Sequence, residues 1–339
     1  MKLPRLLRAA CCAALMFPLS ALALPFSSLV VFGDSLVDNG NVALGIDSGG
    51  FPPVLPGTRQ PTPLPSNGAI PGLPYAGTDN FSNGPAWAQQ FAAMTGLPLT
   101  PALAGGTNFA FGGARTGSPS PTPSLRDQVD FYTLFFPPSA ADTLFILNGG
   151  GNDLRRVFEG TSAATIVSEF VTNTGTMIGQ LFAHGARQFL VSTVPDVGKT
   201  PFAAAADALV PGSAAGATAL ALAMNDALKA MIAGLDPAIR AGIDLLDLFA
   251  FQQALHADPA AFGFDDVTTG CASSLACIAD PLGTFYWDGI HPTAAGHRVI
   301  ARAAYAITVP EPGTVTLLGI ALVALSSRRT WQRSANLRG

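Results

Sequence analysis

The sequence predicts an α/β fold in which a parallel sheet lies between layers of helices. Short apolar, β-branched runs that stop at glycine, proline or polar residues are typical of buried strands, and they alternate with longer segments of helical periodicity. Such alternation implies right-handed crossovers between parallel strands. The chain has 339 residues, 49% hydrophobic and 12% charged, which is enough for one large domain. The predicted strands are 29–32, 143–147, 188–194 and 242–248, and the predicted helices are 86–94, 125–136, 165–183, 214–235 and 292–307.

The first predicted strand ends at Gly33, and a polar cluster containing Ser35 follows directly. In open α/β sheets, ligands bind in the crevice outside the carboxyl ends of the strands. A small hydroxyl group at this place is therefore a candidate for chemistry. Taken alone, Gly-Asp-Ser-Leu is more often only a turn.

The segments that follow this strand contain long stretches without regular periodicity. Residues 43–83 are rich in Gly, Pro, Ser and Asn, and we expect a loop that shapes the pocket. In 106–117, GTNFAFGGARTG, the glycines allow backbone to approach a ligand closely, although a tight turn is the simpler interpretation. Ser124 is expected to cap the helix that begins after it, with Asp127 completing the cap.

The second predicted strand also ends in glycines and polar side chains, Asn152 and Asp153. An Asx-type turn is the default interpretation of this pattern in isolation. The third predicted strand ends similarly, at Pro195 and Asp196.

Asp288 and His291 stand three residues apart, just before the last predicted helix. At this spacing the carboxylate can reach one imidazole nitrogen, which leaves the other nitrogen free to take a proton. We interpret the remaining histidines as structural because a lone histidine more often has that role; these are His184, His256 and His297.

The formal net charge of −4 conceals an uneven distribution. Residues 24–308 carry 11 basic and 21 acidic side chains, a net charge of −10, because seven of the 18 basic residues lie at the two ends. Nucleic-acid binding requires clustered Lys and Arg, so this composition argues against a nucleic-acid partner.

The amino-terminal segment has the pattern of an export signal. Three basic residues precede the apolar run 9–19, and Ala21-Leu22-Ala23 fits the small-x-small cleavage pattern. The apolar run is shorter than the ~20 residues of a spanning helix. We expect a signal peptide over 1–23.

The two cysteines that follow this segment, Cys271 and Cys277, are expected to form a disulfide, because an exported protein meets oxidising conditions. The small loop they close would be stabilised by roughly 2 to 3 kcal/mol. A metal site would need more ligands than this segment offers.

Four motifs in order resemble the GDSL, or SGNH, hydrolase family. They are 33–36 (GDSL), 108–114 (NFAFGGA), 150–153 (GGND) and 288–292 (DGIHP), and segments 80–87 and 270–287 resemble its lipase-type branch. The resemblance implies a flavodoxin-like three-layer α/β/α sandwich with a five-stranded parallel sheet, without metal or cofactor.

The same resemblance assigns roles to individual residues. It implies that Ser35 is the nucleophile, His291 the general base and then acid, and Asp288 the group that fixes the imidazole tautomer. The oxyanion hole would consist of the backbone N–H groups of Ser35 and Gly113 with the side-chain amide of Asn152. Gly113 is chosen over Gly112 by alignment of the motif.

The carboxyl terminus resembles a PEP-CTERM sorting signal of Gram-negative bacteria. Val-Pro-Glu-Pro-Gly-Thr at 309–314 is followed by an apolar run, 315–325, and a basic end. The resemblance implies recognition and cutting by an exosortase, and a protein released or held at the cell surface near secreted polysaccharide. The simpler alternative is a hydrophobic helix with a basic tail.

Together these features predict three parts: a signal peptide (1–23), an SGNH/GDSL hydrolase domain (24–308) and a sorting tail (309–339). The expected activity is that of an exported serine esterase or lipase, which forms an acyl-enzyme on Ser35. One alternative is an O-acetyl esterase acting on exported polysaccharide. The other is a surface protein that binds glycan or lipid without turnover.

Overall fold

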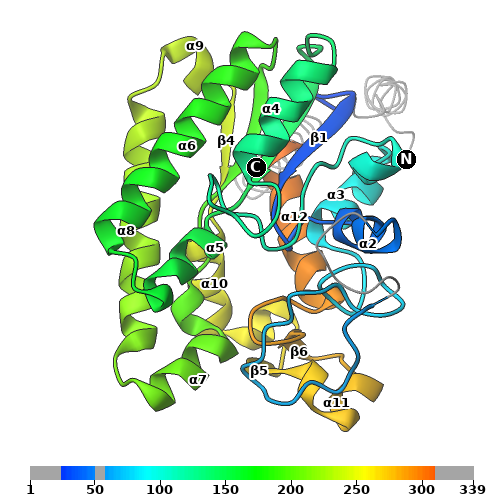
Figure 1. The fold of residues 1–339 in the computed structure, drawn as a ribbon, viewed down its shortest axis with the longest axis vertical. Helices are drawn as coiled ribbons and strands as arrows, with labels where there is room; N and C mark the ends of the chain where they lie inside the picture. Colours follow the sequence, from blue (N-terminus) through cyan, green and yellow to red (C-terminus); the bar gives the residue numbers. More distant parts are fainter. Residues whose placement is uncertain (1–23, 50–57, 310–339) are drawn as a thin grey trace, which may run out of the picture. The chain divides into compact units, whose positions relative to one another are not determined.

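The core of the fold is a parallel sheet of four strands in the order β1-β2-β3-β4 (Figure 1). All strands are parallel, and their neighbours pair in register, for example Val31 with Ile146 and Ile146 with Leu190. The central strands are buried on both faces, as their continuous apolar sequences predict. The strands are β1 (Ser28–Gly33), β2 (Thr143–Asn148), β3 (Gln188–Ser192) and β4 (Ile243–Leu246).

The computed structural model describes residues 24–49 and 58–309. The predicted signal peptide, and the sorting tail from residue 310 onward, lie outside the described residues. Residues Phe26–Thr308 form one structural unit.

The α/β/α sandwich is confirmed, but the described residues form four regular strands in this sheet rather than the five implied by the resemblance. An extended segment at Thr107–Phe111 takes the fifth place, beside β1. Phe109 N–H donates to the carbonyl of Val31 at 2.7 Å, and Phe111 N–H donates to that of Gly33 at 3.1 Å. The pairing stays an isolated bridge because the chain turns away at the glycines that follow.

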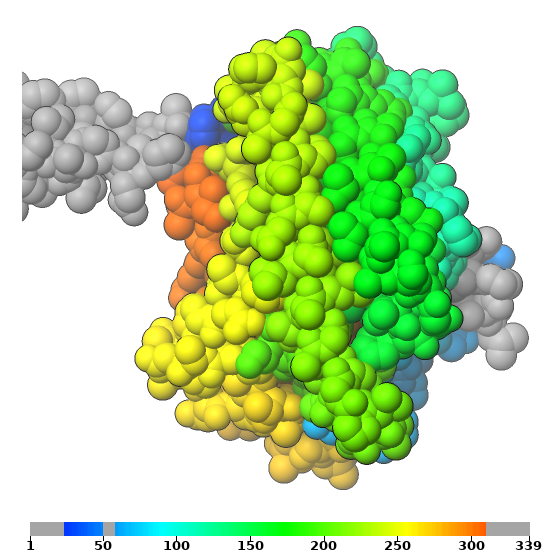
Figure 2. Space-filling model, turned by 90° about the vertical axis from the view of Figure 1, so that its left-hand side faces the viewer, coloured from blue at the N-terminus to red at the C-terminus, as the bar shows by residue number. Residues whose placement is uncertain are grey.

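Helices cover both faces of the sheet. Strand residues that point to one face, such as Phe32, Phe145 and Phe189, share a hydrophobic core with the helices of that face. These are α4 (Leu125–Phe135), α6 (Ala163–Ala183) and α8 (Ser213–Ala233), and Figure 2 shows α8 beside α6 on the outside of the molecule. On the other face, α3 (Trp87–Thr95) packs against α12 (Ala294–Thr308).

The predicted start of α4 is confirmed in detail. Ser124 Oγ accepts the N–H of Asp127 at 3.2 Å, and the Asp127 carboxylate accepts the N–H of Ser124 at 2.9 Å. This reciprocal pair satisfies two donors that the first helical turn leaves unpaired.

Several elements differ from the prediction. The segment predicted as a loop, 43–83, begins inside a helix, α2 (Asn41–Asp47), whose start is held by the carboxylate of Asp38. Strand β4 stops at Leu246 because Asp247 caps a helix that begins directly afterwards, α10 (Leu248–Ala257). Other elements without a prediction are α5 (Gly151–Leu154), α7 (Pro201–Leu209), α9 (Pro237–Arg240), α11 (Leu275–Ala279), β5 (Asp266–Gly270), β6 (Thr284–Tyr286) and the 3-10 helices η1 (Ala102–Ala104), η2 (Arg155–Glu159), η3 (Val197–Lys199), η4 (Pro259–Phe262) and η5 (Cys271–Ser273).

Cys271 and Cys277 form a disulfide, with their Cα atoms 5.1 Å apart. Cys271 is buried in a small cluster with Leu64, Tyr75 and Trp287. The bridge therefore stabilises the part of the structure that leads into the turn carrying Asp288.

Candidate active site

The structure brings three of the predicted site residues together at the carboxyl end of the sheet. Ser35 follows β1, whereas Asp288 and His291 lie between β6 and α12. His291 Nε2 is 2.8 Å from Ser35 Oγ, and His291 Nδ1 is 2.7 Å from Asp288 Oδ2. Asp288 and His291 are buried, so the pair is shielded from water.

The turn at Asp288 fixes the orientation of the imidazole. Asp288 Oδ1 accepts the backbone N–H groups of Ile290 and His291 at 2.9 and 2.8 Å. The other carboxylate oxygen, Oδ2, accepts a hydrogen bond from Nδ1–H of the ring. In that tautomer Nε2 has a free lone pair, which points at the hydroxyl of Ser35.

Tyr75, which belongs to none of the predicted motifs, also contacts Asp288. Its hydroxyl donates to Asp288 Oδ2 at 2.9 Å, and its ring packs edge-on against Trp287 with centroids 5.7 Å apart. Burial is the main cause that raises the pKa of Tyr75 far above its usual value, and the charge of Asp288 is the second. The phenol therefore keeps its proton. The sequence contained no usable signal, because Tyr75 lies in the long irregular segment.

Three candidate oxyanion donors lie around the same cavity. Within the described residues, the backbone N–H groups of Ser35 and Gly113 have no hydrogen-bond acceptor. The N–H of Gly112 donates to Asp38 Oδ2 at 2.9 Å, so it is not available. Asn152 Nδ2 uses one hydrogen on the carbonyl of Ala114 at 2.9 Å and keeps its second.

Two buried carboxylates hold the loops that present these donors. Asp38 accepts the N–H groups of Gly40 and Asn41 as well as that of Gly112, which joins the Ser35 turn to the 106–117 segment. Burial raises the pKa of Asp38 to about 6. Asp153 accepts both the N–H and the hydroxyl of Thr116, which joins the same segment to the helix that carries Asn152.

Asp34, the residue before Ser35, is a buried carboxyl group on the wall of the site. Its Oδ1 accepts the N–H of Leu36 at 3.0 Å and the side-chain amide of Asn148 at 3.2 Å. Burial raises the pKa of Asp34 to about 7. These hydrogen bonds fix the turn from β1 into Ser35.

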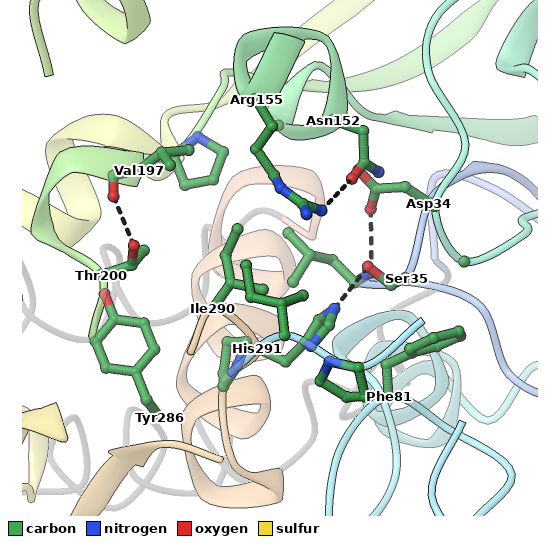
Figure 3. Close-up of a pocket in the computed structure, with 18 of the residues that line it drawn as sticks. Asp34, Ser35, Phe81, Asn152, Arg155, Val197, Thr200, Tyr286, Ile290 and His291 are labelled. Atoms are coloured by element: carbon green, nitrogen blue, oxygen red, sulfur yellow. Dashed lines mark hydrogen bonds between the residues drawn. The ribbon is translucent and has the colours of Figure 1, made fainter. Parts of the chain in front are cut away.

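Ser35, His291, Gly113 and Asn152 all line one cavity of about 430 Å³ (Figure 3). This size is within the range of small-molecule sites. Its wall is largely apolar, with side chains that include Leu36, Ile70, Phe81, Val197, Phe251 and Ile290. The arrangement can therefore hold an apolar group against a hydroxyl that faces an imidazole.

The other histidines lie elsewhere. His297 is buried, and its Nδ1 accepts the N–H of Trp87 at 3.2 Å; burial lowers the pKa of His297 to about 3. His184 Nε2 contacts the carbonyl of Pro137 at 3.0 Å, near the end of α6. His256 lies on α10 and does not line the cavity. Over the ranges 24–49 and 58–309, no group of His, Cys, Asp and Glu side chains is arranged to hold a metal ion.

Comparisons with known proteins show to which family the chain belongs. The family model of the GDSL-like lipase/acylhydrolases matches residues 29–304. The chain is 28% identical to a GDSL esterase/lipase of Arabidopsis thaliana over 80% of this chain and 84% of that one. It is 27% identical to the thermolabile hemolysin of Vibrio parahaemolyticus over 81% of this chain and 62% of that one. Among solved structures, it is similar to an α/β hydrolase from the metagenome of Lake Arreo, with 17% identity over 84% of this chain and 98% of that one and a TM-score of 0.43.

A second family model matches the carboxyl-terminal segment. Residues 308–329 match the PEP-CTERM protein-sorting motif, which indicates export and exosortase processing in a Gram-negative bacterium. Among the helices of the described residues, none has the length and apolar character needed to cross a membrane. Since the first match covers most of the chain, the protein belongs to the GDSL-like lipase/acylhydrolase family of carboxylic ester hydrolases.

Proposed function

We propose that this protein is a serine esterase in which Ser35, His291 and Asp288 form the catalytic triad. The observation that carries the proposal is the continuous chain of contacts from Ser35 Oγ to His291 Nε2 at 2.8 Å and from His291 Nδ1 to Asp288 at 2.7 Å. A serine hydroxyl is a weak nucleophile until a neighbouring base accepts its proton, and this geometry supplies that base.

In the first half of the reaction, Ser35 Oγ attacks the ester carbonyl carbon while its proton passes to His291 Nε2. The π electrons of the carbonyl move to its oxygen, and the N–H groups of Ser35 and Gly113 with the amide of Asn152 stabilise the negative charge. When the tetrahedral intermediate collapses, the bond to the alcohol breaks and His291 returns the proton to the leaving oxygen. An acyl-enzyme on Ser35 remains.

In the second half, water replaces the alcohol. His291 takes a proton from the water, whose oxygen attacks the acyl carbon, and the same donors stabilise the second oxyanion. Collapse breaks the bond to Ser35 Oγ, which regains its proton from His291, and the free acid leaves. Asp288 stays ionised throughout, where it holds the tautomer and stabilises the imidazolium.

The shape and lining of the cavity favour carboxylic esters with an apolar acyl or alcohol part that is larger than an acetyl group. Its wall beyond Ser35 contains apolar side chains, which include Leu36, Phe81, Val197 and Ile290. An alkyl chain would cover these side chains and remove them from water, whereas a methyl group is too small to do so. An O-acetyl esterase or a binding protein without turnover would show different results in the same assay.

The test is hydrolysis of p-nitrophenyl esters from acetyl to octanoyl, together with labelling by a fluorophosphonate probe. We expect kcat/KM to rise beyond the acetyl ester, and Ser35→Ala to abolish both hydrolysis and labelling. Ser66→Ala, at an exposed serine outside the cavity, is the matched control and should behave like the wild type. Unchanged labelling of Ser35→Ala would disprove the assignment, while turnover of acetyl esters alone would support the deacetylase.

We also propose that the exported form consists of the hydrolase domain, 24–308, after removal of the signal peptide and cutting of the sorting tail. The match to the sorting motif supports this processing. Mass spectrometry of the secreted protein tests it: a chain that still ends at Gly339 would contradict exosortase processing.

A further inference from the structure

Of the two arginines that line the cavity, Arg155 has no carboxylate within 4.0 Å among the described residues. Arg155 begins η2, three residues after Asn152, and lines the same cavity as Ser35 and His291. Figure 3 shows its guanidinium between Asn152 and the open part of the cavity. The proposed ester chemistry involves this cation only through Asn152, whose Oδ1 accepts from it.

The contacts of Arg155 leave most of its hydrogen-bonding capacity unused. Nη1 donates to Asn152 Oδ1 at a long 3.3 Å, and the guanidinium lies over the ring of Phe202 at 5.6 Å. Its Nε is buried and has no hydrogen-bond partner among the described residues. No carboxylate of residues 24–49 or 58–309 lies within 4.0 Å of the group.

The other charged groups of the cavity wall are already paired. Arg115 binds both carboxylate oxygens of Glu159 at 2.9 Å. His291 is hydrogen-bonded to Asp288 behind the wall, and Asp34 accepts from Leu36 and Asn148. Within residues 24–49 and 58–309, Arg155 is therefore the arginine of this wall that has no carboxylate in contact.

A partly buried guanidinium with no carboxylate in contact is costly, because it loses water without gaining a partner; Glu159 and Asp288 act on Arg155 only at longer range. Burial accordingly lowers the pKa of Arg155. A guanidinium presents a planar set of donors that matches a carboxylate or phosphate group, and such charge-assisted bonds are strong in an apolar site. An anionic group on the ligand would supply what the protein does not.

We propose that Arg155 binds an anionic group carried by the ester substrate. The enzyme then prefers esters that carry a negative charge to neutral esters of the same shape. This inference rests on the proposed function, because the bound group belongs to an ester that Ser35 attacks. The anion can be carried by the acyl part or by the alcohol part, and both sources present the same oxyanion chemistry to the guanidinium.

The experiment compares two matched pairs of esters. Monoethyl adipate carries a carboxylate on its acyl part, and ethyl adipamate carries a neutral amide in the same place. Likewise, 4-acetoxybenzoate and 4-acetoxybenzamide differ only on the alcohol part. We expect wild-type kcat/KM to favour the charged member of at least one pair by roughly 10- to 100-fold, the effect of one hydrogen bond to a charged group. The pair that shows the preference identifies the part that reaches Arg155.

The variant Arg155→Gln removes the charge and keeps an amide donor near Asn152. We expect it to abolish the preference for the charged ester, mainly through a higher KM. Arg156→Gln is the matched control, because Arg156 pairs with Glu169 and does not line the cavity. This control should keep the preference.

Two outcomes would overturn the inference. One is a wild-type enzyme that hydrolyses the charged and neutral members of both pairs equally, which can be measured even if Arg155→Gln does not fold. The other is a variant that loses activity on charged and neutral esters by the same factor, which would mean that Arg155 only orients Asn152. In either case, neutral-ester hydrolysis that disappears in Ser35→Ala leaves the proposed function intact.

Discussion

Tyr75 donates its hydroxyl hydrogen to Asp288 Oδ2 at 2.9 Å, the same oxygen that faces His291 Nδ1. The two residues lie 213 positions apart, and the tyrosine comes from the long segment before α3. The backbone of Tyr75 is itself held, because its N–H donates to the carbonyl of Asn80 at 2.9 Å. Tyr75 is thus a positioning residue for the proposed triad: it fixes the carboxylate that orients the imidazole.

From this contact we predict the effect of Tyr75→Phe, which removes one donor and keeps the ring. The Asp288 carboxylate loses a hydrogen bond that disperses its charge, so it stabilises the protonated imidazole more strongly. The acid limb of the kcat/KM profile should therefore move to higher pH, and kcat should fall by about tenfold because the carboxylate is less firmly held. The measurement is the pH dependence of p-nitrophenyl ester hydrolysis.

Tyr132→Phe is the control for this variant, because the Tyr132 hydroxyl contacts Ser139 and does not line the cavity. It should leave the pH profile unchanged. If Tyr75→Phe lowered kcat without moving the acid limb, the hydroxyl would not act through the charge of Asp288.

Asn152→Ala should reduce kcat by about 10² to 10³, with a much smaller change in KM, because an oxyanion donor acts mainly on the transition state. The corresponding control is Asn173→Ala, whose amide contacts Thr116 and is not on the cavity wall. Steady-state kinetics on one good ester are sufficient. A variant in which KM alone rises would place Asn152 in substrate binding and not in the oxyanion hole.

The disulfide gives a stability prediction. Its cysteines are six positions apart, and closing so small a loop in the unfolded chain is expected to contribute roughly 2 kcal/mol. The double variant Cys271→Ser, Cys277→Ser should therefore lose about 2 kcal/mol in the free energy of unfolding by urea. A reducing agent should lower the stability of the wild type by a similar amount and leave the double variant unchanged. Equal stability in all samples would contradict this contribution.

The buried carboxyl of Asp34 gives a prediction about pH. Its pKa is raised from 3.8 to about 7, so the folded protein keeps this proton to a higher pH than the unfolded chain. This group stabilises the fold below pH 4, and that contribution is lost as the pH rises to about 7. The side chain of Asp34→Asn does not titrate. The free energy of unfolding of the variant minus that of the wild type should therefore be larger at pH 8 than at pH 4. The difference should be a few kcal/mol at most, because one unit of pKa shift is about 1.4 kcal/mol.

Urea unfolding of both proteins at pH 4, 6 and 8 provides the measurement. Comparing the difference between the two proteins removes the contributions of Asp38 and His297, which are the same in both. Asp226→Asn, at an exposed position on α8, is the control. Its difference from the wild type in free energy of unfolding should be the same at pH 4, 6 and 8. A constant difference for Asp34→Asn as well would mean that Asp34 stays ionised in the folded protein.

Local patterns predicted much of the fold. The four strands were found from their apolar runs, and the Ser124 cap was found from residues three positions apart, because both depend on neighbours in the chain. The helix α10 was missed because β4 runs into it through Asp247, without the glycine or proline that marks other boundaries. The fifth strand was implied by resemblance, and the edge segment beside β1 is too short to form one.

Periodicity, motif order and a three-residue spacing are local features of the chain, so they suffice to predict the fold class, the family and the Asp288–His291 pair. Which groups meet across the domain is visible in the folded molecule alone. Within the part of the chain that the structure describes, Asp38 occupies the N–H of Gly112 and leaves that of Gly113 free, Tyr75 reaches Asp288, and Arg155 has no carboxylate within 4.0 Å. Contacts between distant residues depend on how the helices and loops pack around the sheet, and no local pattern records that packing.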